Sequence, residues 1–380
     1  MLTASESALA RAVLVHGPIA RSALAARLAL SPASLTRLVK PFLDHGVFVE
    51  YPHVTDGLVG RPVTPLDVAP GWGRFGGVKL TGDRAHAVVT DARAEVLADS
   101  ERALHGTDPE SVSRTVAELI GDLVSSEGGQ STVLRAVGVS LGGTVRAGRV
   151  EFAPFLGWEG VDLAAPLQAD IGVPVTVEND VIALTEAEHW FGRARGIQGF
   201  SLITIGAGVG HGLVIDDRVV RTAAGADHIG HVPLAPSGPV CARGHRGCAQ
   251  MLTTASILAE CTRDLGRPVT PEDVLSLARR GDRTVAAIVA RNAVALGRLI
   301  ALVAGLTQQS VVVLAGEGMD LVAVAEERLR ETIAQAREPR ADPIEVHIDD
   351  SGFPAWARGA AAVAVQAAVD GIDLTASPAP

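Results

Sequence analysis

Apolar residues at helical spacing predict three short helices at the start of the chain. The first ends at His16-Gly17-Pro18, and the second lies at about residues 22–28. The third is predicted from about Pro32 to Asp44, because Ser31 is a favoured N-cap and proline suits the first helical position. After Gly46 the pattern changes from helical periodicity to that of strands.

Two short strands, at about 47–51 and 63–68, flank a loop shaped by glycine and proline. Three helices followed by a hairpin predict a winged helix-turn-helix over residues 1–68, with the third helix in the major groove. The candidate DNA contacts are polar residues on or near the outer face of that helix, together with one arginine at the wing tip: Ser34, Thr36, Arg37, Lys40 and Arg61. For Arg37 alone a solvated helix face is the simpler interpretation, but the whole pattern favours DNA binding.

The remainder, residues 72–380, alternates buried strands with helices and glycine turns, which predicts an α/β body of two lobes around a cleft. Strands are predicted at about 75–80, 85–90, 95–99, 133–140, 174–177, 200–205, 213–216, 310–314 and 344–348. Helices are predicted at about 109–124, 253–265, 271–281, 284–307, 320–337 and 353–370, with another starting at Val181.

Two segments of the body carry candidate ligand-binding groups. Asn179 and Asp180 follow a strand predicted at 174–177, and open α/β sheets bind ligands at the carboxyl ends of their strands. Helix capping would equally explain both residues. The glycine-rich segment 206–212 separates two predicted strands, and its glycines would admit either a phosphate or the close backbone approach of a tight hairpin.

A possible metal site lies between Gly225 and Gln250. His231, Cys241 and Cys248 have a spacing compatible with a soft divalent ion, most simply zinc. A structural zinc site needs a fourth ligand, for which His245 is a candidate. The alternative is a polar loop that holds two unrelated thiols.

Composition limits the class of protein. The 380 residues are 47% hydrophobic, enough for a large core, and the net charge is −10. Residues 1–66 nevertheless hold six Lys/Arg against four acids, leaving 27 against 39 beyond them. Three cysteines, and the lack of a leader-like or membrane-spanning apolar run, predict a cytoplasmic protein with reduced thiols and no membrane association.

The ordered set of motifs resembles the ROK family of repressors and sugar kinases. The set comprises the N-terminal head, Gly142-Gly143-Thr144, Glu178-Asn179-Asp180, the segment 206–212, and Gly230-His231 with the following cysteine loop. This resemblance implies an actin-like, ribonuclease-H-like (ASKHA) body of two lobes that binds a sugar and forms a homodimer or homotetramer. Regulators of the family carry the head, whereas its kinases lack it.

The chain departs from the kinases of this family at both phosphate loops. Where they have Asp-x-Gly-Gly-Thr, Lys79 replaces the acid and Asp83 replaces the threonine, and Ala207 replaces a threonine of the second loop. An ammonium group cannot help to hold Mg²⁺, so ATP binding is not expected. Asp180 matches the general base of the kinases, and we interpret it as a vestigial base that accepts a hydrogen bond from the ligand.

The resemblance also implies the sugar and metal contacts. The sugar-binding positions are Gly143, Asn179, Asp180, His228, His231 and Gln250. His228 and Gln250 replace glutamates, which changes the pattern of hydroxyls that can be recognised and favours an unusual sugar or an acidic derivative, or else a loss of sugar binding. Arg243 replaces the middle cysteine of the zinc loop, so zinc requires His245, a carboxylate or water as its fourth ligand.

The sequence therefore predicts a sugar-responsive repressor of carbohydrate genes, which binds a palindromic operator in double-stranded DNA. Two alternatives remain open. One is an ATP-dependent hexose kinase with an accessory head, and the other is a constitutive DNA-binding protein whose sugar site is vestigial.

Overall fold

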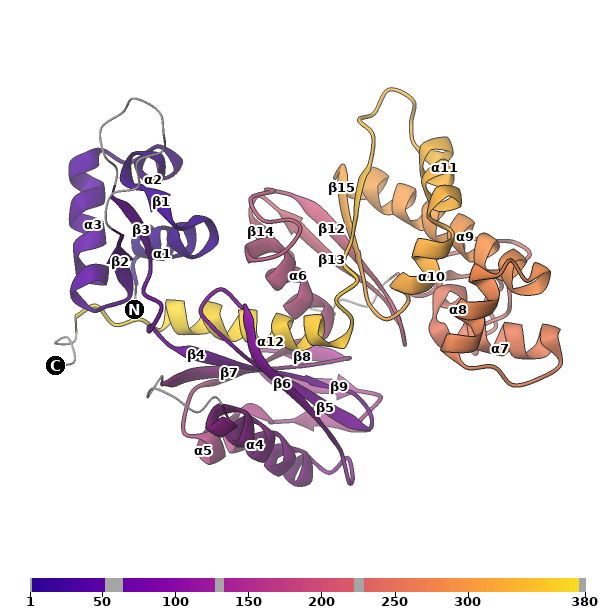
Figure 1. Cartoon of the computed structure of the whole chain (residues 1–380), viewed down its shortest axis with the longest axis horizontal. Helices are drawn as coiled ribbons and strands as arrows, with labels where there is room; N and C mark the ends of the chain where they lie inside the picture. The colour runs from indigo at the N-terminus through magenta and orange to yellow at the C-terminus, as the bar shows by residue number, and fades with distance from the viewer. Residues whose placement is uncertain (1, 52–63, 127–132, 222–228, 376–380) are drawn as a thin grey trace. The chain divides into compact units, whose positions relative to one another are not determined.

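The chain divides into two compact units. The computed structural model describes residues 2–51, 64–126, 133–221 and 229–375. Unit 1 comprises residues 1–196 and 356–380, and unit 2 comprises residues 197–355. Unit 1 therefore contains both the N-terminal head and the first half of the body (Figure 1).

The head consists of three helices and a small antiparallel sheet of order β1-β3-β2 (Figure 1). Its elements are α1 (Ala4–His16), β1 (Ile19–Ala20), α2 (Arg21–Arg27), α3 (Pro32–Asp44), β2 (Phe48–Glu50) and β3 (Pro65–Val68). The predicted bounds of α3 are confirmed, and the Ser31 hydroxyl caps it by accepting from the Ser34 N–H at 3.2 Å. The two-residue strand β1 was not predicted. Arg61 and the rest of the segment between β2 and β3 lie outside the described residues.

One hydrophobic core joins the head to the body within unit 1. Leu9, Val13 and Phe42 of the head belong to the same buried cluster as Trp190 and Val365 of the body. A continuous core of this kind packs the head against the body instead of leaving it on a free linker.

The body of unit 1 is built on a five-stranded sheet of order β11-β7-β4-β5-β6. Its strands are β4 (Arg74–Leu80), β5 (Arg84–Thr90), β6 (Val96–Ala103), β7 (Leu134–Leu141) and β11 (Val175–Asn179), and its helices are α4 (Pro109–Ser126), α5 (Ala164–Ile171), α6 (Asp180–Trp190) and α12 (Phe353–Asp370). Strands β4, β7 and β11 are parallel, so their carboxyl ends lie at one edge.

Helix α12 is rich in alanine because it packs closely against β4 and α6. A Cβ added at Gly77 of β4 would lie 2.5 Å from the backbone nitrogen of Ala361, and one at Gly359 would lie 2.9 Å from the nitrogen of Leu184 in α6. The glycines and the small alanine side chains let α12 approach the sheet and α6 closely.

A second, three-stranded sheet of unit 1 was missing from the sequence prediction. It has the order β10-β9-β8 and consists of β8 (Thr144–Arg146), β9 (Arg149–Ala153) and β10 (Trp158–Val161). Helix α5 was also missed. These elements are short, with turns at Gly148 and Gly157 that have positive φ, and they carry no long periodic pattern.

Unit 2 contains a five-stranded sheet of order β14-β13-β12-β15-β16 and several helices. Its strands are β12 (Phe200–Ile205), β13 (Val209–Ile215), β14 (Arg218–Val219), β15 (Val311–Ala315) and β16 (Glu345–Ile348). Its helices are α7 (Thr254–Leu265), α8 (Pro271–Arg279), α9 (Arg283–Thr307), α10 (Met319–Val324) and α11 (Glu326–Ala336), with a 3₁₀ turn at Ala249–Leu252.

The structure corrects two predictions in this unit. The segment 206–212 was predicted to interrupt the strands, but its second half is itself part of a strand. Strand β13 begins at Val209 and pairs with β12 as an antiparallel hairpin. The helix predicted at 320–337 is two helices that meet at Ala325. Helix α9 is long and apolar enough to cross a membrane, but 61% of that apolar window is buried inside the protein, as expected of a core helix.

Candidate functional site

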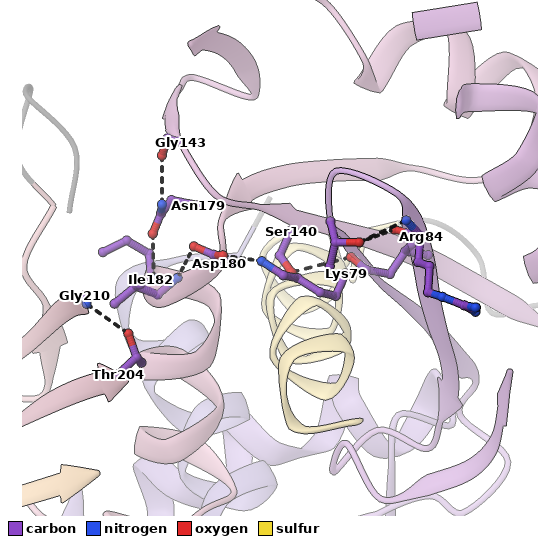
Figure 2. A network of polar contacts seen from close by, with 12 residues as sticks. Lys79, Arg84, Ser140, Gly143, Asn179, Asp180, Ile182, Thr204 and Gly210 are labelled. Atoms are coloured by element: carbon purple, nitrogen blue, oxygen red, sulfur yellow. Dashed lines mark hydrogen bonds and ion pairs between the residues drawn. The ribbon is translucent and has the colours of Figure 1, made fainter. Parts of the chain in front are cut away.

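Asn179 and Asp180 lie where β11 ends and α6 begins. The Asn179 side chain caps α6 by accepting from the Ile182 N–H at 3.1 Å, and its amide nitrogen donates to the carbonyl of Gly143 at 2.8 Å (Figure 2). The helix-capping interpretation of Asn179 therefore holds. The same side chain also fixes Gly143, so three predicted sugar contacts are brought together in unit 1. Whether each of them touches a sugar stays a prediction.

Asp180 forms a largely buried ion pair with Lys79 of β4 (Figure 2). The two side chains are only 13% and 8% exposed. The Lys79 ammonium bonds to Oδ2 of Asp180, while Oδ1 accepts from the Val181 N–H at 2.9 Å. The same ammonium group also lies over the indole of Trp356, with the ring centroid 5.1 Å from Nζ, a cation–π distance.

A carboxylate occupies the glycine turn of unit 2. The side chain of Glu317, which follows β15, lies so close to Gly206 that a Cβ there would collide with its Oε2. The hairpin beyond it is held by the Gly210 N–H, which donates to the Thr204 hydroxyl at 3.2 Å. This turn is thus formed by glycine backbone and faced by an acid.

The predicted metal ligands of unit 2 converge. His231, Cys241, His245 and Cys248 each offer a ligand atom, and these atoms lie within 4.8 Å of one another. Nδ1 of His231 is 3.7 Å from the sulfur of Cys241 and 3.7 Å from that of Cys248. A tetrahedral zinc ion, with Zn–S near 2.3 Å and Zn–N near 2.0 Å, places its nitrogen and sulfur ligands about 3.5 Å apart. The donor set and spacing fit zinc.

The pKa values of His231 and Cys241 are shifted toward the metal-ligating form, whereas the pKa of Cys248 is shifted away from it. Burial, together with the nearby His245 and Arg243, lowers the pKa of His231, which favours the neutral, ligating imidazole. Burial opposes ionisation of Cys241, but backbone N–H groups around its sulfur outweigh this and lower the pKa of the thiol. Burial raises the pKa of Cys248.

The remaining predicted sugar contacts belong to unit 2. Gln250 lies against Gly230, where an added Cβ would be 2.9 Å from Nε2 of the glutamine. His231 is half-buried and directs Nδ1 at the sulfurs, which leaves Nε2 for another partner. His228 lies outside the described residues.

Helix α3 presents the predicted DNA contacts that fall within the described chain. Thr36, Arg37 and Lys40 are exposed, whereas Ser34 is half-buried and bonds to Ser31 through its hydroxyl at 2.9 Å. The Thr36 hydroxyl donates to the carbonyl of Pro32 at 2.9 Å. Arg37 and Lys40 are thus the two exposed cationic side chains of this helix, and their contact with DNA stays a prediction.

Sequence reasoning missed three residues of these sites. Trp356 contacts Lys79, and Glu317 contacts Gly206. Both contacts span more than 100 positions of the sequence, so no local pattern pointed to these residues. Arg93 joins head and body: it pairs with Asp67 of β3, and its Nε donates to the carbonyl of Leu14 at 3.1 Å. An Ala-Arg-Ala turn between two strands carries no signal for such a role.

Two curated relatives resemble the chain over more than half of its length. It is 23% identical to the xylose repressor of Bacillus subtilis (strain 168) over 280 residues, 73% of each chain. It is 31% identical to the glucokinase of Streptomyces coelicolor over 212 residues, 55% of this chain and 64% of the kinase.

Two solved structures share the fold. One is a ROK family transcriptional regulator described as a homolog of the E. coli MLC protein, with a TM-score of 0.80, 23% identity, and coverage of 96% of this chain and 95% of that one. The other is the ROK hexokinase from Thermus thermophilus, with a TM-score of 0.64, 27% identity, and coverage of 78% of this chain and 100% of the kinase. The ROK family itself matches residues 75–367, most of the body, and on this match the chain belongs to the ROK family.

Proposed function

We propose that this protein is a DNA-binding transcriptional regulator, a repressor of carbohydrate genes whose operator affinity responds to a sugar. The observation that carries the proposal is the single hydrophobic core that joins the head to the ligand-binding body. A head packed in this way can respond to changes in the body, which is what a ligand-controlled regulator requires. The repressors among its relatives support the same proposal.

The head is a winged helix-turn-helix in this proposal, and α3 enters the major groove. Arg37 and Lys40 contact phosphates and base edges, with Ser34 and Thr36 as nearby polar contacts and Arg61 on the wing. Palindromic operators are read by symmetric proteins, so the regulator acts as a homodimer or a homotetramer.

Polar links reinforce the core between head and body. Besides the Arg93–Asp67 pair, a guanidinium nitrogen of Arg11 in α1 lies 3.2 Å from Nε2 of His189, and the same guanidinium stacks over Trp190 at 5.4 Å. His189 and Trp190 form the last turn of α6, the helix whose first residue is Asp180. A change at Asp180 can thus be transmitted along α6 to the head.

The described contacts argue against phosphoryl transfer. A kinase of this fold needs Mg²⁺ and a nucleotide phosphate beside its base, but Asp180 is bonded to an ammonium group. In unit 2, the Glu317 carboxylate lies against Gly206, where its charge would repel phosphate oxygens. Asp180 therefore serves as a hydrogen-bond acceptor for the sugar and has no catalytic role.

Zinc completes the proposal for unit 2. His231, Cys241, His245 and Cys248 would hold the ion, and His245 would take the place of the cysteine that Arg243 replaces. The ion would be structural, because four protein ligands leave no open position for chemistry. It would orient His231, whose Nε2, together with Gln250, forms the sugar contacts proposed for this unit.

A mobility-shift and footprinting experiment with the promoter DNA of the protein's own locus tests the proposal. We expect a protected palindrome, and a sugar from a panel of pentoses, hexoses and amino sugars should change the affinity by about 5- to 150-fold. Replacing Arg37 and Lys40 by alanine should weaken binding about tenfold or more and lower the salt slope by about 2. Arg330→Ala, an exposed arginine of α11, is the matched control. No binding at low salt would refute the proposal.

A coupled assay with ATP and the same hexoses tests the kinase alternative. We expect no turnover. Turnover that disappears in Asp180→Asn would establish a kinase and contradict our assignment of Asp180.

A further inference from the structure

Two phenylalanine side chains of unit 1 are exposed to solvent, and both belong to the segment that follows the Gly142-Gly143 turn. Phe152 of β9 is 54% exposed, and Phe155, in the turn before β10, is 60% exposed. Within the described residues they are the only phenylalanines or tryptophans that are exposed in this way. Exposed aromatic rings beside polar groups are typical of ligand contacts.

The ring of Phe155 lies beside the polar groups of the proposed sugar site. A Cβ built on Gly142 would be 3.5 Å from Cδ2 of Phe155 and also 3.5 Å from Oδ2 of Asp180. The aromatic ring and the carboxylate therefore flank the same glycine. Asp180 is the residue that Lys79 neutralises, so the group next to the ring is a net-neutral ion pair.

We propose that Phe155 is a specificity-determining residue of the effector site, on which the C–H face of a pyranose ring stacks while a hydroxyl of the same sugar bonds to Asp180. An aromatic face carries partial negative charge and attracts the weakly positive C–H groups of a sugar. A Cβ at Gly142 would be in van der Waals contact with both groups, so the glycine leaves the space between the ring and the carboxylate free of protein side chain. This inference rests on the proposed sugar-responsive function and names its ligand class: an uncharged cyclic sugar.

Phe152 provides the matched control. It is a phenylalanine of similar exposure three residues earlier, but what lies nearest to the neighbouring Gly143 is its backbone carbonyl instead of its ring. If the loss of any exposed aromatic ring weakens sugar binding, both Phe152→Ala and Phe155→Ala should show it. If the sugar stacks on Phe155, only Phe155→Ala should bind the sugar more weakly.

The test is isothermal titration of the full chain with the sugar of the panel that binds wild-type protein most tightly. We expect Phe155→Ala to weaken binding roughly tenfold, about 1.4 kcal/mol, whereas Phe155→Tyr and Phe152→Ala stay within roughly threefold of wild type. The open-chain polyol derived from the same sugar should bind worse than the sugar to wild type, and this preference should disappear in Phe155→Ala. Operator affinity without sugar should be unchanged in the control variant Phe152→Ala.

The outcomes separate this inference from the function on which it rests. If wild-type protein binds a sugar and Phe155→Ala binds it equally well, the stacking role is wrong and the regulator proposal stands. If wild-type protein binds no sugar of the panel, the sugar-responsive function fails, and the role of Phe155 fails with it.

Discussion

Each unit contains a cluster of polar side chains, but the two clusters differ in where their interaction partners come from. In unit 1 the polar groups are paired within the chain. Lys79 forms an ion pair with Asp180, and the Asn179 amide accepts from the Ile182 N–H and donates to the Gly143 carbonyl. In unit 2 two thiols and two imidazoles converge, and such a set is stabilised by a cation that the chain does not supply. The charges of the unit 1 cluster are therefore balanced within the chain, whereas the cluster of unit 2 has four donors that could hold a metal ion.

The largest expected effect is the loss of metal from unit 2. Chelation should lower the melting temperature by roughly 5 °C or more, because an ion that binds only the folded state stabilises it. Elemental analysis should find about one zinc per chain in wild type and much less in His245→Ala. Arg243→Cys should retain the metal.

His105→Ala, which changes an exposed histidine of unit 1, controls for the loss of an imidazole. Full zinc content in His245→Ala would show that another group is the fourth ligand. Wild-type protein without zinc after purification in zinc-containing buffer would contradict the metal site and remove the contrast between the units.

The next effect tests the internal pairing of unit 1. Lys79→Met should destabilise the protein by about 3 kcal/mol, because it leaves the carboxylate of Asp180 buried without its counter-ion. Adding Asp180→Asn to Lys79→Met should restore part of that loss, since the double variant buries no charge. Urea denaturation measures both changes.

Arg84→Ala is the control, because Arg84 pairs with Glu101 at 2.6 Å on the surface. This substitution should lower the free energy of unfolding by less than about 1 kcal/mol. If Lys79→Met and Arg84→Ala lower the free energy of unfolding equally, the Lys79–Asp180 pair stabilises the protein no more than a surface ion pair does.

The smallest effect concerns acid stability in unit 2. Burial lowers the pKa of His211 to about 4, against about 6.5 in an unfolded chain. The folded state therefore holds the histidine neutral, and its contribution to stability is complete above pH 6.5 and is lost as the pH falls toward 4. Linkage gives a loss of about 2 kcal/mol by pH 5.

His211→Gln should flatten the dependence of the unfolding free energy on pH between 6.5 and 5. His105→Gln, an exposed histidine, should leave it unchanged. An unaltered pH slope in His211→Gln would show that other groups cause the acid sensitivity. Ser201, whose hydroxyl lies 3.3 Å from Nε2 of His211, offers the glutamine a hydrogen-bond partner.

Local signals in the sequence were enough for much of the fold. The N-cap Ser31 and the proline after it predicted the start of α3, and α12 has its predicted bounds. The glycine-rich segment 206–212 was ambiguous between a phosphate loop and a hairpin, and the pairing of β12 with β13 makes it a hairpin. Helical periodicity and capping act within one or two turns, so a sequence window contains their causes.

The sequence by itself determined the order of the elements, the ligand types near Cys241 and Cys248, and the replacement of an acid by Lys79. Only the tertiary structure decided what those residues contact. Lys79 and Asp180 are 101 positions apart, and Trp356 is farther still from both, so chain topology alone brings an ammonium, a carboxylate and an indole together. The exposure of Phe155 is likewise a property of the folded surface, which no pattern of neighbouring residues records.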